Sequence, residues 1–104
     1  MGRFGRQREP FLEIRYYIDP RTANLHIHTH DVFEHEVEEV LAQPGEDRPG
    51  SNGSRVIIGQ TDAGRYLRVI YIRDPEPDSV FVITAYELTG KPLKAYRRRQ
   101  KRRI

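Results

Sequence analysis

The chain of 104 residues contains no cysteine and no long apolar run. Without cysteine, disulfide scaffolds, thiolate zinc sites, iron–sulfur clusters and cysteine nucleophiles are excluded. The apolar runs fall far short of the roughly 20 residues that a membrane-spanning helix needs, so we expect no membrane contact. The basic N-terminal segment is not followed by the apolar core of a secretory signal, which favours the cytoplasm. A chain of this length predicts one domain that folds on its own core or with a partner.

Acidic residues are also absent from residues 91–104, which carry a net charge of +8. Residues 1–9 carry +2 and residues 10–90 carry −7, so the overall +3 is a balance between an acidic body and basic ends. We predict a mobile basic arm over 1–10, a single α+β domain over 11–96 and a basic C-terminal tail over 97–104. Such an end suits contact with a polyanion, whereas the body is not a generic nucleic-acid surface.

Alternating apolar and polar residues predict four strands. The first covers residues 11–18 and ends at Asp19-Pro20, because proline cannot continue a strand ladder. Residues 55–60, 66–73 and 79–87 predict an antiparallel meander. Its first turn is Thr61–Gly64, in which glycine can adopt a positive φ, and its second turn is DPEPD at 74–78.

Helical spacing appears at two places. Residues 31–42 predict a helix with Asp31 and Glu34 as a capping box. Residues 91–103 predict a C-terminal helix with Pro92 in its first turn and Leu93 and Tyr96 as its apolar anchors. Residues 43–54 are rich in proline, glycine and serine and predict a loop. Residues 20–30 fit either a short helix or a strand that pairs with the first one, and local propensity favours the strand.

The order of these elements, together with four short stretches, resembles one known family. These are NLHIHTHDVFEHEVEEVL at 24–41, VIIGQTDAGRYLRVIYI at 56–72, FVITAYELT at 81–89 and the basic Tyr96-Arg97-Arg98. They resemble the BrnT toxins of bacterial type II toxin–antitoxin modules, which are compact ribonucleases of the RelE/ParE-like superfamily. The resemblance spans residues 11–98.

The resemblance implies an α+β fold in which the N-terminal strand and the meander form a small antiparallel sheet. Two N-terminal helices and a basic C-terminal helix complete it. Residues 20–29 are then a short helix, against their strand propensity. The implied function is a ribonuclease toxin that acts on RNA, needs no cofactor and is neutralised by an antitoxin protein. A homodimer or a hetero-oligomer with the antitoxin is compatible with this function.

Metal-independent RNA cleavage needs a base for the 2′-hydroxyl proton and an acid for the leaving oxygen, and histidine suits both roles near neutral pH. An arginine can hold the phosphate and an aromatic ring can stack a base. The predicted catalytic residues are therefore His26, His30, Arg68 and Tyr86. The predicted RNA-binding residues are the basic and aromatic side chains near the meander and the last helix: Arg65, Lys94, Tyr96, Arg97, Arg98 and Arg99.

Three alternatives stay open. On a strand, His26, His28 and His30 would share one face and could bind a metal, whereas a helix would place His28 opposite; we expect no metal. Gln60 and Tyr86 stand where the BrnT family often carries arginine, which leaves room for a non-catalytic interaction or RNA-binding domain of the same fold. The acidic face of residues 34–39 is either a solvated surface or the docking site of a basic antitoxin segment.

Overall fold

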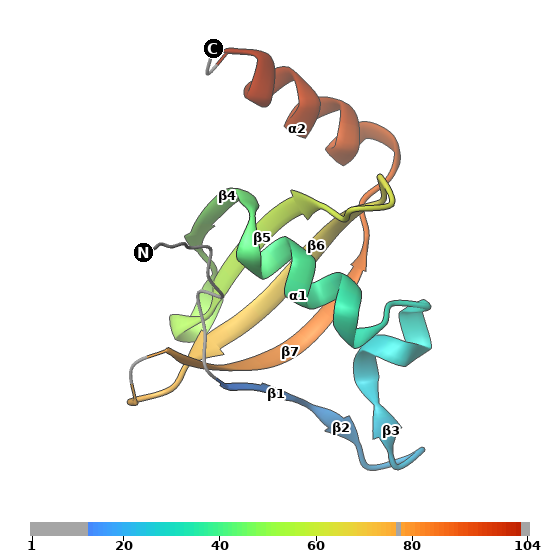
Figure 1. Cartoon of the computed structure of the whole chain (residues 1–104), viewed down its shortest axis with the longest axis vertical. Helices are drawn as coiled ribbons and strands as arrows, with labels where there is room; N and C mark the ends of the chain where they lie inside the picture. Colours follow the sequence, from blue (N-terminus) through green and yellow to red (C-terminus); the bar gives the residue numbers. More distant parts are fainter. Residues whose placement is uncertain (1–12, 77, 103–104) are drawn as a thin grey trace, which may run out of the picture.

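A computed structural model describes residues 13–76 and 78–102, which form an α+β fold with a mixed five-stranded sheet and two α-helices (Figure 1). The strand order is β1-β7-β6-β5-β4, in which β1 is parallel to β7 and the other pairs are antiparallel. The strands cover Glu13–Tyr16 (β1), Pro44–Pro49 (β4), Arg55–Gln60 (β5), Tyr66–Arg73 (β6) and Ser79–Glu87 (β7). Neither helix in this described part of the chain has the length and apolarity to cross a bilayer.

The predicted meander is confirmed with the expected bounds for all three strands. Gly64 closes the first turn with φ of +97°, where an L-residue would be strained. The register aligns Ile58, Arg68 and Tyr86 across the three strands. The neighbouring row of Ile57, Val69 and Ala85 therefore points to the opposite face of the sheet.

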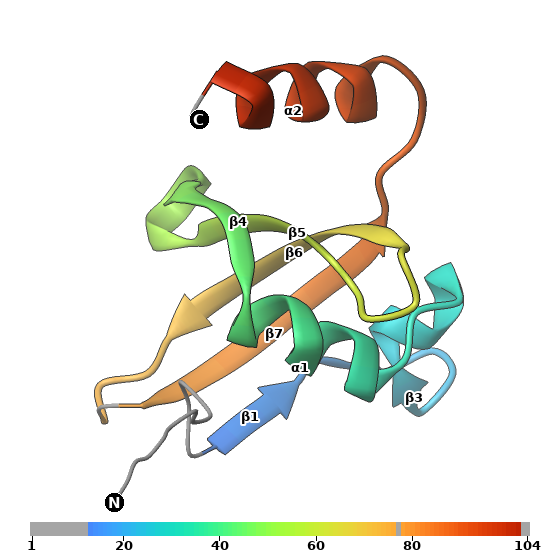
Figure 2. The ribbon, with the colours of Figure 1, turned by 45° about the horizontal axis from the view of Figure 1, so that its top comes forward.

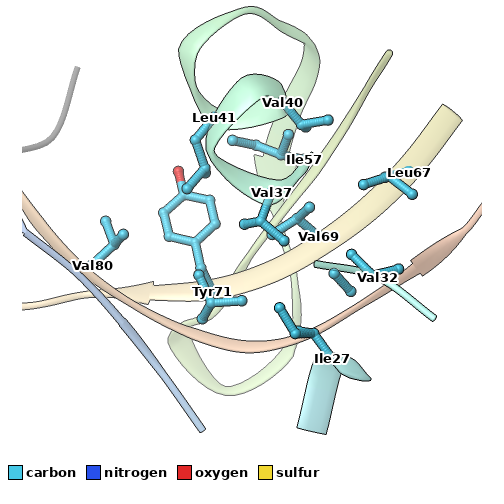
Figure 3. Close-up of a cluster of buried hydrophobic side chains, with 12 residues drawn as sticks. Ile27, Val32, Val37, Val40, Leu41, Ile57, Leu67, Val69, Tyr71 and Val80 are labelled. Atoms are coloured by element: carbon cyan, nitrogen blue, oxygen red, sulfur yellow. The ribbon is translucent and has the colours of Figure 1, made fainter. Parts of the chain in front are cut away.

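Helix α1 (Glu34–Ala42) covers the face that carries Ile57 and Val69. Its side chains Val37, Val40 and Leu41 are buried against this row and against Tyr71 (Figure 3). Helix α2 (Gly90–Arg102) lies at one end of the sheet (Figure 2). Its Tyr96 and Leu93 pack with Ile58 and Leu88 on the other face. The two faces are thus covered by different helices, and the row of Arg68 and Tyr86 lies on the α2 side.

The predicted cap of α1 is wrong. Asp31 lies before the helix with φ of +58°, at the end of the short 3-10 helix η1 (His26–His30). The helix begins after Phe33, whose backbone N–H donates to Glu36 Oε1 at 3.1 Å. The chain must reverse between η1 and α1, and Asp31 makes this reversal in the left-handed region that aspartate tolerates. The capping carboxylate therefore comes from Glu36 rather than from Asp31.

The short helix predicted over 20–29 is only partly correct. Residues Ile18–Asp19 (β2) pair with Asn24–Leu25 (β3) in a two-stranded ribbon, and helical geometry begins only at His26. The turn between them is fixed by side chains, because Asp19 Oδ1 accepts the Arg21 N–H and Thr22 Oγ1 accepts the Asn24 N–H. The strand that local propensity favoured is present only at Asn24–Leu25.

The loop predicted over 43–54 contains an edge strand, which is a further correction. Strand β4 pairs with β5 with a bulge between Pro44 and Glu46, and its two prolines are its first and last residues. Proline is compatible with such an edge position. A 3-10 turn, η2 (Ser51–Gly53), then leads into β5.

The predicted C-terminal helix is confirmed, with Tyr96 buried and Leu93 packed against the same cluster. The helix continues through Arg102, so residues 97–102 belong to α2 rather than to a separate tail. The predicted arm over 1–10 lies outside the described residues.

Candidate functional site

The 3-10 helix η1 lies beside the last part of β7. Pairing of β1 with β7 ends where the Tyr17 N–H donates to the Val82 oxygen at 2.9 Å, and the His26 N–H then donates to the Tyr17 oxygen. Beyond this point η1 packs against β7, with Ile27 only 1% exposed in the core. The burial of Ile27 fixes η1 in place and thereby fixes the histidines on either side of it.

The four predicted catalytic residues form one continuous row. The ring centroids of His26 and His30 are 5.2 Å apart, and those of His30 and Tyr86 are 5.9 Å apart, both in edge-to-face contact. Arg68 is the direct cross-strand partner of Tyr86. The row thus crosses from η1 to β7 and β6 on the face of the sheet opposite α1, and we call these residues the histidine row.

Asp19, a residue that sequence reasoning did not select for the site, lies next to His26. Asp19 Oδ2 lies 3.6 Å from His26 Nδ1, which is an ion-pair distance rather than a hydrogen bond. Asp19 is only 3% exposed, and Arg21 donates to it through Nε at 3.2 Å and Nη2 at 3.0 Å. The Arg21 side chain and backbone N–H lower the pKa of Asp19 to about 2, so its carboxylate is charged at neutral pH.

Arg68 and Thr84 bring unused polar groups to the same face. Arg68 Nε and Thr84 Oγ1 are buried without a hydrogen-bond partner among the described residues. Thr84 pairs with Ile70, two residues along from the pair of Arg68 and Tyr86. Buried donors without partners are uncommon, so the two groups mark a place where a bound ligand would gain hydrogen bonds. Thr84 carries no signal in the sequence that separates it from other strand threonines.

Arg65 lies away from the histidine row. Its Nη1 donates to the Asp31 oxygen at 2.7 Å and to Glu36 Oε1 at 2.9 Å, and its Nε lies 3.4 Å from Glu87 Oε1. These contacts fasten the turn between β5 and β6 to the start of α1. We therefore interpret Arg65 as a structural cation and leave it out of the site.

The predicted RNA-binding residues of helix α2 fall into two sets. Tyr96 is buried, and Arg99 pairs with Glu46 of β4, with Nη2 at 3.0 Å from Oε1. Lys94, Arg97 and Arg98 are instead exposed, and together with Lys101 they line an open groove. The first set attaches the helix to the sheet, and the second set faces solvent.

Comparison with known families adds one finding. Residues 23–87 match the family described as Domain of unknown function (DUF4258), which is more than half of the chain. The chain belongs to the DUF4258 family. No curated protein and no solved structure matches it. The whole histidine row lies within the DUF4258 match, whereas α2 follows it.

The three histidines of the H-x-H-x-H motif in this DUF4258 domain do not converge. His28 turns toward α1, where its Nε2 lies 2.9 Å from Glu34 Oε1, while His26 and His30 face the row. Across residues 13–76 and 78–102, no group of three or more histidine or acidic side chains is placed to hold a metal ion.

Acid titration tests the anchoring of Asp19. Because its folded pKa is depressed, Asp19 stabilises the fold above its ordinary pKa of 3.8, and this stability is lost as the pH falls toward 2. We expect Asp19→Asn to show a weaker loss of thermal stability between pH 4 and pH 2 than the unchanged protein. The measurement is the unfolding temperature at several pH values. Asp62→Asn, which removes an exposed carboxylate, is the control and should follow the unchanged protein; equal curves for all three proteins would contradict the assignment.

Proposed function

We propose that this protein is an endoribonuclease toxin of a type II toxin–antitoxin module, with a BrnT-like fold of the RelE/ParE-like superfamily. The observation that carries the proposal is the histidine row, which puts two imidazoles, a tyrosine ring and a guanidinium side by side on one sheet face. The order of strand, helix, three-stranded meander and basic helix supports the fold assignment.

The row has the groups that metal-independent RNA cleavage requires. One imidazole would take the proton of the 2′-hydroxyl, and the O2′ atom would then attack the neighbouring phosphorus. The bond from phosphorus to the 5′ oxygen breaks, and the second imidazole protonates that leaving oxygen. The products are a 2′,3′-cyclic phosphate and a free 5′-hydroxyl. Each proton transfer has its own histidine, so the reaction needs no cofactor.

The other residues of the row have electrostatic and binding roles. Arg68 has no ion-pair partner among the described residues, so its charge is available to the developing negative charge on the phosphate. Tyr86 is half-buried between Arg68 and His30, where its ring offers a face for an unpaired base. Asp19 is a positioning residue, because it acts on the reaction through the ring of His26.

Expression in a bacterial host tests the toxin proposal directly. We expect induction of the unchanged protein to arrest growth and to fragment cellular RNA, and we expect the double variant His26→Ala, His30→Ala to do neither. The measurements are growth curves and electrophoresis of total RNA at matched protein levels. Normal growth and intact RNA at high expression of the unchanged protein would contradict the proposal. Co-expression of a cognate antitoxin should restore growth.

The second candidate function is a non-catalytic interaction or RNA-binding domain that keeps the same fold. The observation that favours it is at Gln60, where the BrnT family often has arginine. The Gln60 side chain donates through Nε2 to the Gly64 oxygen of its own turn at 3.1 Å, and it carries no charge. If RNA binding and phenotype survive unchanged in the double histidine variant, this second function is favoured over catalysis.

A further inference from the structure

Helix α2 carries four exposed cations that line one open groove. Lys94 is three and four residues from Arg97 and Arg98, and so is Lys101, so the four cations form one stripe along the helix. No ion pair joins any of the four to another described residue, whereas Arg99 on the packed side pairs with Glu46. The helix contains no acidic residue that would neutralise the stripe.

The four cations also repel one another. Like charges three and four residues apart destabilise a helix, and here each member of the stripe has two such neighbours. A bound polyanion would remove this repulsion and would thereby stabilise α2. The stripe spans eight residues, which is a rise of about 10 Å along the helix, so that it can contact more than one phosphate of a single strand.

Tyr66 connects the stripe to the histidine row. Its half-buried ring lies 6.0 Å from the ring of Tyr96, and the Arg97 guanidinium lies 6.0 Å from its centroid. Tyr66 is on β6, two residues before Arg68, and therefore on the same face of the sheet. A strand whose phosphates lie on α2 would thus pass over an aromatic ring before it reaches Arg68 and Tyr86.

We propose that the α2 stripe and Tyr66 form a second subsite that binds single-stranded RNA outside the reacting position. The four cations contact successive phosphates and Tyr66 stacks one unpaired base. A duplex would satisfy the cations but would offer no free base to Tyr66. The inference rests on the proposed function in one respect, which is the choice of RNA as the natural polyanion. Binding at this subsite does not require cleavage.

Salt-dependent binding tests the stripe. The probe is a fluorescent 2′-O-methyl RNA oligonucleotide, which lacks the nucleophilic hydroxyl and so reports binding alone. If the four cations each neutralise one phosphate, the affinity of the unchanged protein for the probe should fall about fifty-fold between 50 and 200 mM KCl. The affinity of the double variant Lys94→Gln, Lys101→Gln should fall only about seven-fold over the same range. The control Lys91→Gln with Arg102→Gln removes the same charge from the same helix outside the groove, and should keep the steep dependence.

Tyr66 is tested by a pair of substitutions. Tyr66→Leu should weaken binding of the oligonucleotide roughly five- to hundred-fold, whereas Tyr66→Phe keeps the ring and should bind normally. Circular dichroism of both variants checks that α2 is retained. Equal affinity for duplex and single-stranded RNA would overturn the stacking role.

The outcomes separate this inference from the proposed function. If the unchanged protein binds the probe through the stripe but does not cleave RNA, the nuclease proposal is refuted and the subsite is retained. Equal binding by the stripe variant and its Lys91 and Arg102 control would refute the subsite whatever the cleavage result. Binding to anionic lipid vesicles through the same lysines, without binding to the RNA probe, would also refute it.

Discussion

Replacing His30 with alanine is expected to lower the rate of RNA cleavage by about 10²- to 10⁴-fold, which is the usual contribution of general acid–base catalysis. His30 contacts both His26 and Tyr86, so it lies at the centre of the histidine row. Its side chain is exposed, and hence its removal leaves no cavity in the core. The loss should therefore be in chemistry and not in folding. The measurement is single-turnover cleavage of an RNA oligonucleotide, together with the free energy of unfolding.

The chain offers a matched control for this experiment. His35 is an exposed histidine on α1, on the opposite side of the sheet from the row, so His35→Ala should cleave RNA at the normal rate. His26→Ala should resemble His30→Ala, and the double variant should lose little more than either single one, because the two rings act as a unit. Equal rates of RNA cleavage by His30→Ala and His35→Ala would show that the histidine row does not take part in catalysis.

The sequence predicted the meander because its signals are local. Each strand alternates with a period of two, and Gly64 supplies the turn that joins the first two. The same periodicity placed Arg68 and Tyr86 on one face once the register was known. His26 and His30 meet, with ring centroids 5.2 Å apart, although the segment is a 3-10 helix, in which residues three apart rather than four apart are aligned.

The remaining features depend on contacts between distant parts of the chain. Strand β4 was missed because its proline- and glycine-rich sequence resembles a loop, and only pairing with β5 makes it a strand. Arg65 and Arg99 were assigned to RNA because composition reveals a charge but not its partner. The structure pairs them with Glu36 and Glu46, which lie 29 and 53 residues away. Asp19 was expected only to end the first strand, and its contact with His26 depends on the ribbon of β2 and β3.

The attachment of α2 gives the second large expected effect. At the bulge of β4, the backbone of Gly45 approaches the ring of Tyr96 so closely that an added Cβ would lie 1.8 Å from Tyr96 Oη and 2.9 Å from Cζ. The Cβ would also lie 3.1 Å from the Ile58 oxygen, which is backbone and cannot move aside easily. Gly45→Ala must therefore displace Tyr96, and we expect it to destabilise the protein by about 1–3 kcal/mol.

A double-mutant cycle in denaturant shows whether that loss comes from the contact with α2. In a Tyr96→Leu background the ring that opposes the Cβ is gone, so Gly45→Ala should cost less there, with a coupling of about 0.5–3 kcal/mol. Strictly additive losses would place the strain in β4 itself. Because Tyr96 is the buried anchor of α2, its displacement should also separate Arg97 of the stripe from Tyr66. Gly45→Ala should then weaken RNA binding at α2. The histidine row should stay in place, because Gly45 does not contact the elements that carry it, which are η1, β6 and β7.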